Sequence, residues 1–287
     1  MGIEIKSLSN ALGAEAVGLD LTQDIDDATF HTLRQSWLDN LVLVIRGQKI
    51  STDDQLRFAR RFGELEEVKS KKDDVNQKQH VLYVSNRIVE GSKGALPEGE
   101  MHFHSDQCYY EKPVQLTMLN ALELPRRGGE TLFVNLYQAW EGLSEDLKAR
   151  IRHRLIYNQY DYDVDPTRRN AILNENAPHF VHPMVVRHPE TGKLTLFVNR
   201  LMTHHIVGLD TDQSDRLLSA LFDHIEQQAF LYEHKWQPYD LLLWDNRAVL
   251  HARRDFDPSE ARILRRVAVK GSRPVAAFIA EPNARAK

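Results

Sequence analysis

The chain has 287 residues, of which 42% are hydrophobic and 27% charged, values typical of a globular protein that buries a substantial core. Lysine and arginine number 37 against 41 aspartates and glutamates, so no global basic field attracts nucleic acid or an anionic membrane. The single cysteine, Cys108, excludes an intrachain disulfide framework and a multi-cysteine zinc site.

The first elements alternate helix and strand. The N-terminal MGIEIKSLSN has no apolar signal region, and no stretch reaches the roughly 18 apolar residues of a membrane span, so we expect a cytoplasmic protein. Residues 28–39 have helical periodicity behind Asp26 and Asp27, and LVLVIRG is typical of a buried strand. Ser51 and Asp54 predict a capping box for a second helix that Gly63 should end. The polar stretch EEVKSKKDDVNQKQ then predicts a loop.

From residue 112 onward, short apolar runs such as VQLTMLNALEL, ETLFVN, HPMVVRH and LTLFVN alternate with turns. Two helices are predicted among them, from about Ser144 and from about Asp212. Their expected buried side chains are Leu147, Ile151 and Leu155 in the first, and Leu217, Leu218, Leu221 and Ile225 in the second. AFLYEHKWQPYDLLLWDN and RILRRVAVKG close the chain as strands. We therefore expect one mainly β domain over residues 1–287, with flanking helices.

The stretch EMHFHSDQCYY sets His102, His104 and Asp106 at alternating positions, on one face of an extended segment. His104 and Asp106 are roughly 7 Å apart at Cα, close enough to share an ion, whereas His102 lies roughly 13 Å from Asp106 unless the chain curls. Two histidines and one carboxylate suit non-haem Fe(II), and we expect the third ligand to be His251, just after the strand LLLWDN. The alternative for an isolated H-x-D is a surface or hydrogen-bonded strand pair.

The segment ARILRRVAVKG carries arginines on both faces of a predicted strand. Arg262 and Arg266 share one face with Leu264, while Arg265 lies on the other. If the first face points inward, each guanidinium needs an anion, because an unpaired buried charge is unfavourable. A dicarboxylate co-substrate and an anionic substrate would supply two anions. The alternative is an exposed edge strand whose arginines pair with acidic residues at 255, 257 and 260.

In the order and spacing of its sequence motifs, the chain resembles the taurine dioxygenase and 2,4-dichlorophenoxyacetate dioxygenase family of Fe(II)/2-oxoglutarate enzymes. The resemblance runs over almost the full length, through GAEAVGLDL, LVLVIRGQKIS, FARRFGEL, HSD, ELPRRGGETLFVN, HPETGKLTLFVN, WDNRAVLH and the arginine strand. It implies a double-stranded β-helix core (jelly-roll, cupin-like) with Fe(II) bound by His104, Asp106 and His251. It also implies that Thr131 and Arg262 hold the distal carboxylate of 2-oxoglutarate.

The implied reaction uses O₂ and 2-oxoglutarate, releases succinate and CO₂, and hydroxylates a small organic anion. Arg266 matches the family arginine that reaches the anionic group of that substrate, which we expect to be a sulfonate or an aryloxy or alkyl carboxylate. Where the hydroxylated carbon bears a heteroatom, the product would release sulfite, a phenol or an amine. The resemblance also implies a homo-oligomer, a dimer or a tetramer.

The substrate pocket is expected to include His102, which has no ligand counterpart in the family, and Tyr109, Tyr160 and Met202. For the tyrosines and the methionine the alternative is ordinary core packing. The histidine that binds sulfonate after FGEL in the taurine enzymes is absent, and whether the 64–80 loop replaces it through Lys69, Lys71 or Lys72, or is only solvated, stays open. We expect the WDN segment to support the ligand-bearing turn by hydrogen bonds, and Cys108 to be buried and inert.

Two rival functions use the same residues. A zinc hydrolase could bind its metal through the same three side chains, but it has no role for Thr131 and Arg262. A non-catalytic jelly-roll binding protein would keep the site without turnover. Stoichiometric succinate formation would exclude the first, and failure to consume 2-oxoglutarate with Fe(II), O₂ and a broad substrate panel would favour the second.

Overall fold

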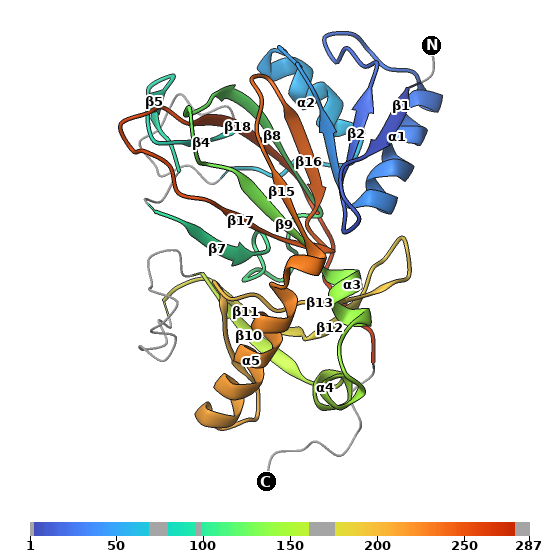
Figure 1. The fold of residues 1–287 in the computed structure, drawn as a ribbon, viewed down its shortest axis with the longest axis vertical. Coiled ribbons are helices and arrows are strands. Elements are labelled where there is room, and N and C mark those ends of the chain that lie inside the picture. Colours follow the sequence, from blue (N-terminus) through green and yellow to red (C-terminus); the bar gives the residue numbers. More distant parts are fainter. Residues whose placement is uncertain (1–2, 69–79, 96–98, 161–175, 279–287) are drawn as a thin grey trace.

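Two antiparallel-rich sheets dominate the upper part of the molecule (Figure 1). The computed structural model describes residues 3–68, 80–95, 99–160 and 176–278. The larger sheet consists, in spatial order, of β1 (Glu4–Ser7), β2 (Ala14–Val17), β3 (Val42–Ile45), β16 (Leu241–Asp245), β8 (Leu116–Glu123), β18 (Ile263–Val269) and β4 (Leu82–Ser85). The smaller sheet consists of β15 (Leu231–His234), β9 (Thr131–Asn135), β17 (Val249–Arg253) and β7 (Met101–His104).

The two sheets pack face to face through a shared hydrophobic cluster. Val44, Leu242 and Leu264 of the larger sheet meet Phe133 and Val249 of the smaller sheet in this cluster. Packing of inward-facing side chains from two sheets is the arrangement expected of a jelly-roll core. The predicted fold class, mainly β with flanking helices around a jelly-roll, is confirmed.

Two helices cover the outer face of the larger sheet, which explains why β3 and β16 are buried on both faces. The first, α1 (Asp27–Asn40), begins where the Asp26 side chain accepts a hydrogen bond from the Thr29 backbone N–H. The second, α2 (Thr52–Arg60), has the predicted capping box at Ser51. Buried side chains of both helices and the sheet form a second hydrophobic cluster, which includes Trp37, Leu56, Leu243, Val267 and Val269. The second helix ends at Arg60, slightly before the predicted stop at Gly63.

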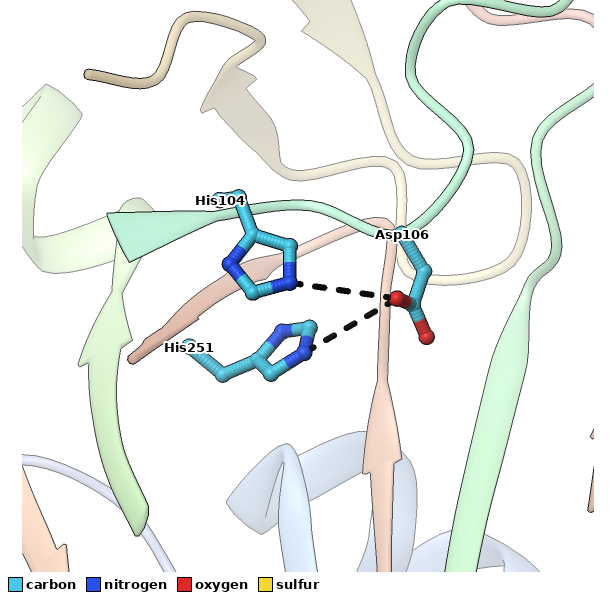
Figure 2. Close-up of side chains that lie close together, drawn as sticks. All are labelled: His104, Asp106 and His251. Carbon is cyan, nitrogen blue, oxygen red and sulfur yellow. Dashed lines mark ion pairs between the residues drawn. The ribbon is translucent and has the colours of Figure 1, made fainter. Parts of the chain in front are cut away.

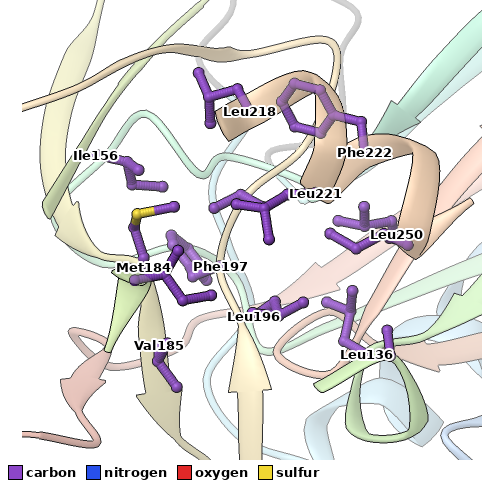
Figure 3. Close-up of a cluster of buried hydrophobic side chains, with 14 of the residues drawn as sticks. Leu136, Ile156, Met184, Val185, Leu196, Phe197, Leu218, Leu221, Phe222 and Leu250 are labelled. Carbon is purple, nitrogen blue, oxygen red and sulfur yellow. The ribbon is translucent and has the colours of Figure 1, made fainter. Parts of the chain in front are cut away.

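The lower part of the molecule has its own core (Figure 3). The helices of this part are α3 (Leu136–Glu141), α4 (Glu145–Ile151), α5 (Thr211–Ile225) and the 3-10 helix η2 (Gln228–Phe230). One of its two sheets consists of β11 (His179–Pro183), β10 (Leu155–Gln159) and β14 (Thr203–Ile206). The other sheet consists of β13 (Leu194–Leu196), β12 (Val185–Arg187) and β19 (Val275–Ala276). The short hairpin β5 (Ile88–Val89) and β6 (Ser92–Lys93) lies beside β4. The four apolar residues predicted on α5 are buried.

One expected core residue of this region is not buried. Helical periodicity predicts Leu155 on the buried face of the helix beginning near Ser144, but that helix ends at Ile151. A turn follows, in which the Arg154 N–H donates to the Ile151 carbonyl, and Leu155 begins β10 with 42% of its surface exposed. The alternation of the strand then places Ile156 in the core in its stead.

The arginine strand β18 lies between β8 and β4, so the alternative of an exposed edge is wrong. Its faces divide as predicted: Leu264 joins the cluster between the sheets, while Arg265 points outward beneath α2. There the Arg265 guanidinium donates to the Gln55 Oε1 at 2.7 Å, the Thr52 Oγ1 at 3.1 Å, the Asn120 Oδ1 at 3.0 Å and two carbonyls of the loop before α2.

Among the helices within the described ranges, none is long and apolar enough to cross a membrane.

Candidate active site

Three side chains converge between the sheets (Figure 2). His104, Asp106 and His251 each offer one ligand atom, and these atoms lie within 4.8 Å of one another. His104 Nε2 lies 4.0 Å from Asp106 Oδ1, and His251 Nε2 lies 3.9 Å from the same oxygen. Because metal–ligand bonds to nitrogen and carboxylate oxygen are about 2.0–2.2 Å, atoms at these separations can share one ion.

Strand register brings the two imidazoles together. His251 on β17 pairs directly with His104 at the end of β7, and their ring centroids lie 4.1 Å apart. The strand ends at His104, and residues from Asp106 onward form a turn in which Gln107 has a φ of +58°. The expected extended conformation through Asp106 is therefore wrong, since it is the turn that carries the carboxylate to the imidazoles.

His102 contributes its backbone to this arrangement. Its carbonyl lies 2.9 Å from His104 Nδ1, so Nδ1 carries the proton and Nε2 presents its lone pair toward Asp106. The His102 imidazole is not part of the cluster of described side chains that could hold an ion.

The electrostatics of the three side chains suit a divalent metal. Burial lowers the pKa of His104, and burial with the neighbouring His104 lowers the pKa of His251 to about 3, so both imidazoles are neutral. Burial alone would raise the pKa of Asp106, but the Arg266 guanidinium and the two histidines outweigh this effect and hold that pKa below its ordinary value. Two neutral imidazoles and one carboxylate with open positions form the donor set of non-haem Fe(II).

The second oxygen of Asp106 is held by protein groups. Thr117 Oγ1 donates to Asp106 Oδ2 at 2.7 Å, and Arg266 Nη2 donates to the same oxygen at 2.8 Å. This leaves Oδ1, the oxygen nearest the two imidazoles, to serve as the metal ligand.

Asn246 fixes the turn that carries Asp106. Its Oδ1 accepts from the Asp106 N–H at 2.8 Å, and its Nδ2 donates to the carbonyls of Asp106 at 2.9 Å and Val114 at 2.8 Å. The Ser105 hydroxyl donates to the Asn246 carbonyl at 3.0 Å. Within the WDN segment, Asn246 thus makes the predicted hydrogen bonds around the ligand-bearing turn, whereas the Asp245 carboxylate bonds His188 and Arg247 instead.

Replacing Asn246 with alanine should lower both stability and metal affinity. The change leaves buried N–H and C=O groups of the turn without partners, so we expect a loss of roughly 2–4 kcal/mol in the free energy of unfolding. Loss of a group that orients a metal ligand should weaken metal binding about 10- to 100-fold. Urea denaturation of the metal-free protein and calorimetric titration with Fe(II) under anaerobic conditions measure the two effects. Unchanged metal affinity would show that the turn holds Asp106 without Asn246.

Thr131 and Arg262, the residues expected to hold 2-oxoglutarate, are both buried. Arg262 Nε and Nη2 donate to the Gly129 carbonyl at 3.2 and 3.0 Å, while its buried Nη1 has no hydrogen-bond partner among the described residues. Thr131 Oγ1 accepts from Trp236 Nε1 at 3.0 Å, which leaves the hydroxyl proton to be donated elsewhere. An unsatisfied guanidinium N–H in the interior is a place where an anion fits.

Gly129 is required for this placement of Arg262. Its φ of +72° is accessible mainly to glycine, and a Cβ there would lie 2.9 Å from Arg262 Nε.

The residues expected around the substrate lie in different environments. Tyr109 is buried and its ring centroid is 5.1 Å from that of Tyr160, which is 41% exposed. Met202 is a buried member of the lower core, with its Sδ 3.6 Å from the Cys108 Sγ. Burial raises the pKa of the Cys108 thiol to about 12, consistent with the expected inert residue. Lys69, Lys71 and Lys72 lie outside the described residues.

The sequence interpretation did not single out Thr117, Trp236 or Arg253. Arg253 lies two residues after His251 on a strand, so simple alternation could have placed it on the same face. For Thr117 and Trp236 the sequence offers no local signal, because their partners lie on other segments, Asp106 in the turn after β7 and Thr131 on β9.

Comparison with known proteins agrees with this geometry. Residues 4–268 match the family model described as taurine catabolism dioxygenase TauD, TfdA family. Pentalenolactone F synthase from Streptomyces avermitilis is 35% identical over 277 residues, covering 90% of each chain. An (S)-phenoxypropionate/alpha-ketoglutarate-dioxygenase from Sphingobium herbicidovorans is 32% identical over 279 residues, covering 91% of this chain and 92% of that protein.

Solved structures show the same similarity. A taurine dioxygenase from Burkholderia xenovorans superimposes with a TM-score of 0.79 at 28% identity, covering 96% of this chain and 94% of that one. The structure of AAD-2 in complex with Mn(II) and N-oxalylglycine superimposes with a TM-score of 0.80 at 25% identity, covering 96% of this chain and all of that one. The chain therefore belongs to the TauD, TfdA family of 2-oxoglutarate-dependent dioxygenases, as its motifs predicted.

Proposed function

We propose that the protein is an Fe(II)- and 2-oxoglutarate-dependent dioxygenase that hydroxylates a small organic anion, a sulfonate or an aryloxy or alkyl carboxylate. The observation that carries the proposal is the convergence of His104, Asp106 and His251 between the two sheets. Relatives named for phenoxypropionate and for 2,4-dichlorophenoxyacetate, both aryloxy carboxylates, and one named for sulfate esters support this range of substrates.

Each residue of the site has a task in this reaction. Bound Fe(II) would supply the activation of O₂ that accompanies decarboxylation of 2-oxoglutarate to succinate and CO₂. His104, Asp106 and His251 would hold the metal, while Thr131 and Arg262 would orient 2-oxoglutarate through its distal carboxylate. The burial of His104, Asp106, Thr131 and Arg262 would limit the access of water to the reacting centre.

Arg266 would orient the substrate. One of its nitrogens holds Asp106 Oδ2, and a guanidinium has five N–H donors, so the same side chain can bind Asp106 and a substrate anion together. His102, Tyr109, Tyr160 and Met202 are proposed to shape the rest of the pocket, although the burial of Met202 in the lower core suits an indirect contribution.

Succinate release tests the proposal. Purified protein with Fe(II), O₂ and 2-oxoglutarate should form succinate in proportion to a substrate drawn from a panel of sulfonates, phenoxyalkanoates and amino-acid derivatives. Hydrolysis of a substrate with zinc and without 2-oxoglutarate would instead identify a hydrolase. Absence of 2-oxoglutarate consumption across the panel would identify a binding protein.

Replacing Arg266 with alanine should impair use of the primary substrate more than binding of the co-substrate. Loss of charge-assisted hydrogen bonds worth about 1.5–3 kcal/mol corresponds to an increase of about 10- to 100-fold in the KM for the primary substrate. At saturating Fe(II), which offsets the loss of the hydrogen bond from Arg266 to Asp106, the KM for the co-substrate should change much less. Steady-state kinetics with each substrate varied in turn make the comparison, and an equal loss of both would mean that the roles of Arg262 and Arg266 are wrongly assigned.

We further propose a single dioxygenase domain that works in the cytoplasm as a homo-oligomer, a dimer or a tetramer. The single cysteine suits a reducing compartment, and the oligomeric state rests on the resemblance to the family. Light scattering coupled to size-exclusion chromatography measures the number of subunits directly.

A further inference from the structure

Arg253 lies on the same sheet as Thr131. Strand β17 pairs with β9 in regular register, His251 opposite Phe133 and Arg253 opposite Thr131. Directly opposed residues of an antiparallel pair share a face and have Cβ atoms about 4.5–5.5 Å apart. Arg253 therefore starts from the same inner face as His251, roughly 7 Å farther along the strand, beside the threonine proposed to hold the co-substrate.

The surroundings hold this guanidinium in the interior. Arg253 is 6% exposed, and its Nη2 donates to the Gly99 carbonyl just before β7. Its guanidinium carbon lies 5.4 Å from the centre of the Phe256 ring. These contacts restrict the rotamers of a long side chain and hold its charge between the Gly99 carbonyl and the Phe256 ring.

Two like charges thus lie in the interior, Arg253 on β17 of the smaller sheet and Arg262 immediately before β18 of the larger sheet. Arg262 is 1% exposed, and after burial itself the charge of Arg253 is the next largest effect lowering the pKa of Arg262. A bound anion relieves the repulsion between buried like charges. Arg262 Nη1, which has no partner within the described part of the chain, can receive that anion.

We propose that Arg253 is a further binding residue for the co-substrate, so that the distal carboxylate of 2-oxoglutarate is held by Thr131 and two guanidinium groups. The inference rests on the proposed function, and it adds a residue that the family resemblance does not assign. A carboxylate has two oxygens and about four acceptor positions, enough for the hydroxyl and both arginines. The consequence is stronger selection of 2-oxo acids with a negatively charged distal end.

The test compares two 2-oxo acids of equal chain length. Dissociation constants of 2-oxoglutarate and of 2-oxopentanoate, which has a methyl group in place of the distal carboxylate, are measured by anaerobic calorimetry with the Fe(II)-loaded protein. We expect Arg253→Met to weaken 2-oxoglutarate binding about tenfold, the effect of losing one charge-assisted interaction. Binding of 2-oxopentanoate should stay within about twofold, and Arg253→Lys should restore part of the loss for 2-oxoglutarate.

The controls separate this inference from the proposed function and from a structural role. Arg262→Met should show the same selective loss, and the Fe(II) affinity should be unchanged in both variants. Equal weakening of both 2-oxo acids, or no weakening of either, overturns the role of Arg253. If Arg253→Met does not fold, Arg253→Lys takes its place in the comparison. The affinity of Arg253→Lys for 2-oxoglutarate should then be lower than that of the wild type and higher than that of Arg262→Met. If the wild-type protein with Fe(II) does not bind 2-oxoglutarate, the proposed function itself fails.

Discussion

Replacing His104 with alanine is expected to abolish both tight Fe(II) binding and succinate formation, whereas replacing His102 with alanine should leave Fe(II) affinity unchanged. His104 presents Nε2 toward Asp106 Oδ1 and lies opposite His251. His102 contributes to the metal site only through its backbone carbonyl, which accepts from His104 Nδ1. Loss of an outer partner of a metal ligand weakens binding about 10- to 100-fold, so loss of a ligand itself should exceed 100-fold.

The two histidines form a matched pair because they lie two residues apart on one strand. Fe(II) affinity is measured by anaerobic calorimetry and succinate by chromatography, and thermal unfolding of the metal-free variants confirms that each retains the fold. Substrate use by His102→Ala should fall, since His102 is proposed to line the substrate pocket. Loss of metal from His102→Ala, or its retention by His104→Ala, would contradict the proposed ligand set.

Replacing Arg265 with methionine should destabilise the protein by about 3–5 kcal/mol, among the larger effects of a single substitution. The Arg265 guanidinium is buried and connects β18 to α2 and to the loop before it, through Gln55, Thr52 and backbone carbonyls. Methionine would fill much of the volume but would leave the side-chain oxygens of Gln55 and Asn120 without their donor in the interior.

Urea denaturation of the metal-free protein measures this change, and Arg126→Met provides the control. The Arg126 side chain pairs with Glu260 on the surface with 91% of its area exposed, so its loss should change stability by at most about 0.5 kcal/mol. A loss below about 1 kcal/mol for Arg265→Met would mean that the buried hydrogen bonds are replaced by water. Fe(II) affinity of the folded Arg265 variant should be retained, because Arg265 lies on the face of β18 opposite to Arg266.

Short sequence patterns were enough to predict most elements and the faces of the strands. Alternation placed Leu264 inside and Arg265 outside, and the capping box located the start of α2, because such patterns depend only on residues a few positions apart. The motifs H-x-D and WDNRAVLH also predicted the three side chains that meet in the site. Local periodicity failed at Leu155, where the end of α4 was not marked by a distinctive residue.

The way these elements meet depends on contacts between distant parts of the chain. The turn after His104 needs a positive φ at Gln107. This conformation is uncommon for residues other than glycine, so a glutamine at this position does not predict it. The hydrogen bond from the Asp106 N–H to Asn246 Oδ1 joins residues 140 positions apart. The position of Arg253 opposite Thr131 depends on the register of β17 against β9. Such long-range pairings are set by the packing of the whole core, which short sequence patterns do not encode.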